Sequence, residues 1–142
     1  MTGFPPTPAL TTDCVLFTPD GQTLLIRRKN DPFAGGYALP GGFVEIGETV
    51  ETGCRREVLE ETGLEVGDLT LVGVYSDPMR DPRGHTVSIA YATLLRSNAA
   101  PKAGSDALSA EWISNWRSLT LAFDHAQILT DAERVAKLWR RD

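Results

Sequence analysis

The chain has 142 residues, of which 42% are hydrophobic and 23% charged, so it suits one globular domain over residues 1–142. Its net charge of −5 argues against a nucleic-acid partner, because a nucleic-acid-binding surface usually needs a basic face. No apolar run approaches the ~18 residues of a membrane span, and the N-terminus lacks the pattern of a secretory signal. We therefore expect a cytoplasmic protein without a membrane partner.

The first part of the chain predicts a β-hairpin. Residues 11–18 and 22–29 each have the composition of a strand, and the Pro-Asp-Gly sequence at residues 19–21 is a strong turn signal between them. After a loop, residues 37–44 form a short extended segment that a Pro-Gly-Gly sequence interrupts. The sheet is therefore expected to begin with the first two strands of the chain.

A helix follows the extended segment. It begins near Glu48 or Thr49, where negative charge is favoured, and Gly63 suits the left-handed position that ends many helices. Apolar residues recur every four positions and predict a buried stripe, formed by Val50, Cys54 and Val58. Gly53 lies inside this helix, where glycine costs ~1 kcal/mol against alanine, so it either leaves room for a neighbouring group or is tolerated drift.

The second half of the chain predicts three more strands and one more helix. The strands are expected at residues 69–75, 86–95 and 110–113, and a polar loop connects the first two. The last helix is expected to run from Asp124, which can cap it, to about Trp139. Because strands and helices are mixed, the predicted fold class is α/β or α+β, with a curved and largely mixed sheet.

Three glutamates crowd one side of the first helix. Glu57, Glu60 and Glu61 stand at i, i+3 and i+4, and at ~100° per residue they fall at the margin of the buried stripe. Like charges at this spacing cost a few tenths of a kcal/mol each, and a divalent cation held by oxygen ligands would reverse the sign of that energy. For these three residues alone, a solvated acidic face is the alternative to a metal site.

The glutamates belong to a longer gapped pattern over residues 42–64. Seven identities and two apolar positions are fixed in it, namely Gly42, Glu48, Arg56, Glu57, Glu60, Glu61 and Gly63 with Val58 and Leu64. This pattern resembles the Nudix box at every defining position. The resemblance implies a Nudix-type α/β/α sandwich with a mixed sheet. It also implies hydrolysis of the pyrophosphate bond in a nucleoside diphosphate derivative, with Mg²⁺ or Mn²⁺.

The same resemblance implies roles for individual residues. The implied metal ligands are the carboxylates of Glu57, Glu60 and Glu61 and the backbone carbonyl of Gly41. Glu48 and Arg56 would form a pair that supports them. The chemistry is consistent, because a metal ion neutralises a pyrophosphate and lowers the pKa of a bound water, and a nearby carboxylate can take its proton.

The identity of the general base stays open. One of the Nudix-box glutamates can serve, or an acid from a loop after the central strands, for which Asp106 and Glu111 are the candidates. Related chains often carry a glutamate three residues before the tryptophan that matches Trp112, and this chain has Ser109 there. That departure weakens the expectation of a base supplied by the loop.

Three further segments narrow the resemblance to the ADP-ribose pyrophosphatases. Residues 75–85 are similar to a loop of that group, residues 121–126 to the start of its last helix, and residues 27–33 to the run after its second strand. The leading prediction is therefore hydrolysis of a small-molecule nucleotide, ADP-ribose, to AMP and ribose 5-phosphate.

The predicted substrate contacts come from the same segments, and they are Arg28, Phe33, Arg80, Arg83 and His85. The arginines can pair with phosphates or a terminal ribose, Phe33 or Tyr37 can stack on adenine, and a histidine can bind phosphate. Each contact has a structural alternative, such as a solvated loop arginine or a hydrogen-bonded histidine. His125, beside the expected helix cap, is assigned a structural role.

Two other functions stay open at this point. A nucleoside triphosphate pyrophosphohydrolase that acts on damaged or excess nucleotides would use the same box. A domain that senses ADP-ribose in a transcriptional regulator would bind without hydrolysis, but such domains usually have a degraded box and an attached DNA-binding segment, whereas this box is intact. The resemblance also implies a homodimer as one form of assembly.

Overall fold

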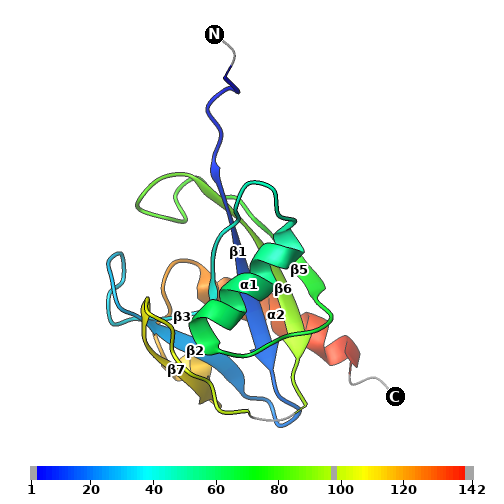
Figure 1. Cartoon of the computed structure of the whole chain (residues 1–142). Coiled ribbons are helices and arrows are strands. Elements are labelled where there is room, and N and C mark those ends of the chain that lie inside the picture. Colours follow the sequence, from blue (N-terminus) through cyan, green and yellow to red (C-terminus); the bar gives the residue numbers. More distant parts are fainter. Residues whose placement is uncertain (1–2, 97–98, 140–142) are drawn as a thin grey trace.

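The computed structural model describes residues 3–96 and 99–139, which fold into a seven-stranded sheet with a helix on each side (Figure 1). In chain order the elements are β1 (Ala9–Phe17), β2 (Thr23–Arg28), β3 (Tyr37–Ala38), β4 (Gly41–Phe43), α1 (Val50–Thr62), β5 (Thr70–Tyr75), β6 (Thr86–Leu94), β7 (Ala107–Ile113), the 3₁₀ turn η1 (Trp116–Ser118) and α2 (His125–Trp139). No helix in the described ranges is long and apolar enough to cross a membrane. The predicted domain over residues 1–142 includes ends outside these ranges and stays a prediction.

The sheet is mixed because β1 has neighbours of both directions. The strand order is β3-β2-β1-β6-β5, while β4 also pairs with β1 and β7 with β2. β1 runs parallel to β6 along its whole length, from Ala9 opposite Thr86 to Phe17 opposite Leu94. β1 and β2 form the predicted antiparallel hairpin, which closes with Phe17 opposite Thr23. The mixed sheet of the sequence prediction is confirmed.

Most strand boundaries lie within two residues of the prediction, and two of the predicted segments differ more. The segment 37–44 divides into β3 and β4, which pair with β2 and β1 respectively. The division falls beside Pro40, which has no N–H to donate to a ladder. β7 is longer than the predicted 110–113 and begins at Ala107, because its pairing with β2 continues past an irregularity to Arg28.

The two helices cover opposite faces of the sheet, with α1 in front and α2 behind it in Figure 1. Alternate residues of β1 point to the two sides. On the α1 side the buried cluster contains Cys14, Leu16, Leu24, Cys54, Val58 and Tyr91. On the α2 side it includes Val15, Phe17, Leu25, Ile128, Leu129 and Ala132. The predicted α/β/α sandwich is thereby confirmed, and both cysteines are buried and free.

The ends of α1 follow the local sequence. The Thr49 hydroxyl accepts a hydrogen bond from the Thr52 N–H at 3.1 Å, which satisfies one of the free donors of the first turn. Gly63 adopts φ 72°, and its N–H donates to the Leu59 carbonyl. Both predicted helix ends are confirmed, so the three glutamates stand on a helix whose position along its axis is fixed at both ends.

Candidate active site

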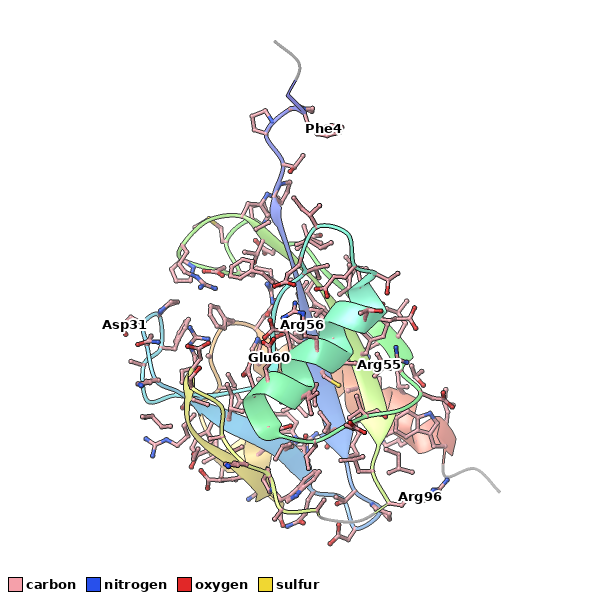
Figure 2. All side chains as sticks on the ribbon, in the orientation of Figure 1. Phe4, Asp31, Arg55, Arg56, Glu60 and Arg96 are labelled. Carbon is pink, nitrogen blue, oxygen red and sulfur yellow. The ribbon has the colours of Figure 1, made fainter. Side chains whose placement is uncertain are left out.

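A cavity of about 420 Å³ lies beside the acidic edge of α1. Residues from β1, β2, β4, α1, the 76–85 loop and the segment before α2 line it. Figure 2 shows Arg56 and Glu60 on the edge of α1 that faces the loop carrying Asp31, which is also part of the lining. Carboxylates and arginines both line it, so the site suits a charged ligand that needs cations and anions at different points.

Glu57 and Glu61 form the acidic side of this cavity. They stand one helical turn apart, so both side chains point toward the backbone of β4. The Gly41 N–H donates to Glu61 Oε1 at 3.4 Å. A Cβ at Gly42 would lie only 2.5 Å from the carboxyl carbon of Glu57. The two glycines therefore let a strand backbone and two carboxyl groups share one small space.

Burial changes the ionisation of these two groups. Burial, together with the nearby charge of Glu57, raises the pKa of Glu61 to about 9. Burial also raises the pKa of Glu57, although Arg56 opposes this shift. The ionised form of Glu61 is thus short of positive charge, whereas Arg56 partly compensates the charge of Glu57.

Arg56 holds the remaining carboxylates of the box. Its Nη2 donates to Glu48 Oε1 at 2.7 Å and its Nε to Glu48 Oε2 at 3.1 Å. Its Nη1 lies 2.9 Å from Glu57 Oε1 and 3.3 Å from Glu60 Oε1. A Cβ at Gly53 would lie 2.7 Å from Glu48 Oε1, so this mid-helix glycine leaves room for the Glu48–Arg56 pair. Of the two readings of Gly53, room for a neighbouring group is therefore the one that fits.

The oxygen atoms on the α1 side of the cavity are suitable ligands for a hard divalent cation. Such cations take oxygen ligands, and Glu57, Glu61 and the backbone at Gly41 supply oxygens in a place where negative charge is undercompensated. Within the described part of the chain, no three acidic, histidine or cysteine side chains already surround one point. Glu60 is instead turned to Arg56, and its side chain is 57% exposed, so it can rotate at low cost.

A buried polar network forms part of the cavity floor and centres on Asp13 of β1. Asp13 Oδ2 accepts from the Ser88 hydroxyl at 2.5 Å, and Asp13 Oδ1 lies 3.4 Å from His125 Nε2. His125 Nδ1 accepts from the Leu39 N–H at 3.0 Å, which leaves Nε2 as the protonated nitrogen facing Asp13. Burial lowers the pKa of His125, so the ring is held neutral. The structural role expected for this histidine agrees with these contacts.

Arg80 also lines the cavity, but its guanidinium is bonded within the same buried network. Its guanidinium makes two bonds to Asp124, at 2.9 Å and 2.6 Å, and a third to the Thr86 hydroxyl at 2.8 Å. The side chain is only 5% exposed. Arg80 was predicted to contact substrate. In the structure its N–H groups donate to Asp124 and Thr86 instead, so the side chain fixes the 76–85 loop against the start of α2.

The other predicted contacts are distributed unevenly. Arg28 and Arg83 both line the cavity, beside the ring of Phe123. Phe33 packs edge-to-face on Phe123, with ring centroids 4.8 Å apart, and is 44% exposed. His85 lies away from the described cavity lining and has its Nε2 3.0 Å from the Ser76 carbonyl. The structure thus brings three of the five predicted contacts to the cavity lining, namely Arg28, Arg80 and Arg83. Of these three, Arg80 is paired with Asp124 and Arg83 with Asp81.

The two loop acids that were candidates for the general base separate clearly. Asp106 lines the cavity. It follows Gly104, whose N–H donates to the Glu61 carbonyl at 3.1 Å, so this loop is docked on the end of α1. Glu111 lies on β7, accepts from the Ser109 hydroxyl at 2.7 Å and is outside the described lining.

Sequence reasoning did not place several lining residues in the site, and these are Thr11, Asp13, Phe43, Asp81 and Phe123. One of them carried a usable signal. Asp13 is a lone acid in an otherwise apolar strand, and such a residue is rarely buried without a polar partner. The rest lie in segments that only the fold brings together.

The NUDIX domain model matches residues 7–132. The ADP-ribose pyrophosphatase of Methanocaldococcus jannaschii is 49% identical over 127 residues, which cover 89% of this chain and 74% of that protein. The ADPR responsive transcriptional repressor NtrR of Acinetobacter baylyi is 34% identical over 134 residues, or 89% of this chain and about half (54%) of the repressor. Among solved structures, the NUDIX domain of Shewanella oneidensis NrtR complexed with ADP ribose gives a TM-score of 0.86 at 29% identity, covering 92% of this chain and 90% of that one.

Fold, site and relatives agree on the class of the protein. The chain belongs to the NUDIX family, and it is a Nudix hydrolase. Hydrolases of this family generally use a divalent metal ion. The predicted family and fold class are therefore confirmed.

Proposed function

We propose that this chain hydrolyses the pyrophosphate bond of ADP-ribose and releases AMP and ribose 5-phosphate. The observation that carries this proposal is the presence, in one cavity, of two half-buried carboxyl groups and of arginine side chains. Glu57 and Glu61 provide oxygen ligands, whereas the arginine side provides positive charge for a phosphorylated ligand, with Arg28 as its cation without a direct ion pair to the described residues. The pyrophosphatase of M. jannaschii, at 49% identity, supports ADP-ribose as the particular substrate.

The metal ligands we propose are the carboxylates of Glu57, Glu60 and Glu61 and the carbonyl of Gly41, with Mg²⁺ as the ion and Mn²⁺ as its substitute. When bound, such an ion neutralises pyrophosphate charge and makes water a better nucleophile. Glu48 and Arg56 hold this ligand set in place, because Arg56 bonds to Glu48 and to Glu57 at the same time.

Asp106 is the loop acid that we propose for accepting the proton of the attacking water, if the box glutamates are all engaged as ligands. It lines the cavity, and the loop that precedes it is docked on the end of α1 by backbone hydrogen bonds from Lys102 and Gly104. Glu111 is set aside because Ser109 holds it on β7. Asp106 thus takes the role for which related chains use a glutamate near this point.

Sensing of ADP-ribose without hydrolysis is the second candidate function. It is favoured by one observation, the likeness to NtrR and to the NrtR domain that binds ADP ribose. The intact set of box glutamates, held by Arg56, supports hydrolysis over sensing. Both candidates share the ligand, so turnover separates them.

The test is a hydrolysis panel with product analysis in the presence of Mg²⁺. ADP-ribose, other nucleoside diphosphate sugars, NADH, dinucleoside polyphosphates and nucleoside triphosphates are compared at equal concentration. We expect ADP-ribose to be turned over fastest, with AMP and ribose 5-phosphate as products. Fast release of pyrophosphate from a triphosphate, with ADP-ribose untouched, would contradict the proposal, and binding of ADP-ribose without turnover would favour sensing.

The matched variants for this panel are Glu61→Gln and Glu51→Gln. Both lie on α1, but Glu51 is in the exposed first turn and outside the cavity lining. Losing a metal ligand at Glu61 should lower kcat/KM at least ~100-fold, whereas the control variant should stay within about twofold of the parent chain. Equal activities of the two variants would show that Glu61 is not a ligand.

Location and assembly are separate proposals. We propose a cytoplasmic location, and from the family resemblance we propose a homodimer. Cell fractionation tests the first. Light scattering at two protein concentrations tests the second, and a constant monomer mass would refute it.

A further inference from the structure

Arg28 is a half-buried cation without an ion-pair partner among the described residues. It lines the cavity from the end of β2, and its Nε donates to the Pro32 carbonyl at 2.6 Å. Within the described ranges no carboxylate comes within 4.0 Å of its guanidinium, and its two Nη groups have no acceptor. Burial and the nearby Arg83 lower the pKa of Arg28 more than the charges of Glu61, Asp81 and Asp31 raise it, and none of these carboxylates forms a direct ion pair with it. A half-buried arginine in this state is suited to an anionic ligand.

Phe123 is the residue that holds this guanidinium in place. The Arg28 guanidinium carbon lies 5.1 Å from the centre of the Phe123 ring, within the range of a cation–π contact. Phe123 has φ 54°, a left-handed conformation that is uncommon for a bulky residue and that clusters at functional sites.

The backbone on both sides of Phe123 is anchored. The Ala122 N–H donates to the Tyr37 carbonyl at 2.8 Å, Asp124 is paired with Arg80, and His125 accepts from the Leu39 N–H. These anchors over-determine the segment, which is how a left-handed phenylalanine can persist. The ring is therefore presented to the cavity from a fixed backbone.

Arg83 shares the same ring but differs from Arg28 in its charge balance. Its guanidinium carbon lies 5.7 Å from the Phe123 centroid and 5.5 Å from that of Phe43. Its Nε and Nη2 bond to the two oxygens of Asp81, at 3.1 Å and 2.8 Å, and the Asp81 side chain is 3% exposed. The positive charge of Arg83 is thus largely compensated inside the protein.

We infer that Arg28 is the residue that binds a phosphate of the substrate pyrophosphate, that Phe123 positions it, and that Arg83 serves as a wall of the site with its charge compensated by Asp81. This inference deepens the proposed function and rests on it for the identity of the ligand. The sequence predicted three substrate-binding arginines. The inference assigns phosphate binding to Arg28 and structural roles to Arg83 and to Arg80, which is paired with Asp124.

The chain offers a close control in Arg27. It is the neighbouring residue on β2, its guanidinium lies 5.5 Å from the centre of the Tyr37 ring, and its Nε donates to the Gly35 carbonyl at 3.1 Å. Arg27 therefore repeats the stacking and the loop hydrogen bond of Arg28. Because side chains alternate along a strand, it lies on the other face and outside the described lining.

The experiment measures kcat and KM for ADP-ribose with Mg²⁺ in the parent chain and in matched variants. Arg28→Gln should raise KM about 10- to 100-fold with kcat within a few-fold, because a charge-assisted bond to phosphate is lost. Arg27→Gln should change KM less than about twofold, as expected for a surface substitution. Arg83→Gln should raise KM less than Arg28→Gln does. Equal KM values for the Arg28 and Arg27 variants would overturn the inference.

Phe123 is tested by rescue and by a double variant. Phe123→Leu should raise KM about three- to tenfold through loss of the aromatic face, and Phe123→Tyr should restore it. Arg28→Gln with Phe123→Leu should be no worse than Arg28→Gln alone, since both act through one guanidinium. Additive effects, or a tyrosine variant as impaired as the leucine variant, would contradict the positioning role of Phe123.

A binding arm separates this inference from the proposed function. Calorimetry measures the affinity of the metal-free variants, in EDTA, for ADP-ribose and for inorganic pyrophosphate. If the parent chain does not turn over ADP-ribose but the Arg28 variant still binds either probe at least tenfold more weakly than the Arg27 variant, the inference holds and the proposed function fails. If turnover is normal and both variants bind equally, the proposed function holds and the inference fails.

Discussion

The two sides of the cavity use opposite ways of handling buried charge. On the α1 side, Glu57 lies close to Glu61, which is short of positive charge, and burial raises the pKa of both. On the arginine side, Arg28 has no direct ion pair among the described residues although the charge of Glu61 favours its ionised form, whereas Arg83 is paired with Asp81. The α1 side carries excess negative charge and the arginine side carries excess positive charge. A pyrophosphate bound together with a metal ion can neutralise both. The comparison shows that neither side is complete in the protein alone.

The largest loss of activity from changing only the α1 side is expected on substitution of Gly42. In Gly42→Ala the new Cβ would lie 2.5 Å from the Glu57 carboxyl carbon, so the carboxylate must move away from β4. A displacement of about 1 Å at a reacting centre can cost about 100-fold, and we expect kcat/KM for ADP-ribose to fall by that order. The affinity of the metal-free protein for ADP-ribose should stay unchanged, because the arginine side is untouched.

The control for this variant is Gly67→Ala. Gly67 is exposed, and a Cβ there meets nothing within 4 Å, so activity should stay within about twofold of the parent chain. Steady-state kinetics of the two alanine variants provides the measurement. Full activity in Gly42→Ala would mean that the position of Glu57 against β4 does not matter for turnover.

The next effect concerns Asp13, which lies under both sides. It sits beneath Gly41 and faces His125, whose ring is 5.3 Å from that of Phe123. Asp13→Ala leaves the buried donors of Ser88 and His125 unpaired, so we expect a loss of about 2–3 kcal/mol in the free energy of unfolding. Urea titration measures it, with Asp68→Ala in an exposed loop as the control. A change below about 0.5 kcal/mol would contradict the network.

The smallest predicted effect is a pH dependence of stability that originates at His125. Its folded-state pKa is lowered by burial below the ordinary value of 6.5, so the unfolded chain takes up the proton first as the pH falls. Stability contributed by the neutral ring is therefore present above about pH 6.5 and is lost below it, with a slope of up to about 1.4 kcal/mol per pH unit. His125→Gln should remove this part of the slope in urea titrations between pH 7 and pH 5. An unchanged slope would show that His125 is not the group that titrates.

The acidic side could be predicted from the sequence because it is local. Glu57, Glu60 and Glu61 stand within five residues on one helix, whose ends Thr49 and Gly63 also mark. Helical geometry alone then fixes which side chains share a face. The close approach of β4 to Glu57 could not be predicted from the sequence, since only the fold shows that Gly42 lies against that carboxylate.

The arginine side could be predicted only in part because it is assembled from distant segments. Arg28 ends β2, Arg83 lies in the 76–85 loop, and Phe123 precedes α2. Their meeting depends on tertiary contacts such as the Arg80–Asp124 pair, for which no local spacing exists. The sequence identified arginines as a class, but whether a given arginine is free or paired depends on Asp81 and Asp124, which the fold brings to them.

The most direct measurement of the division between the two sides is the calorimetric affinity for ADP-ribose of metal-free Glu61→Gln and Arg28→Gln, compared with the parent chain. We predict that Glu61→Gln, which loses turnover, binds ADP-ribose within about threefold of the parent, because the arginine side is intact. Arg28→Gln should bind about 10- to 100-fold more weakly. The reverse result, weak binding by the Glu61 variant and normal binding by the Arg28 variant, would contradict the division of the cavity into a metal side and a phosphate-binding side.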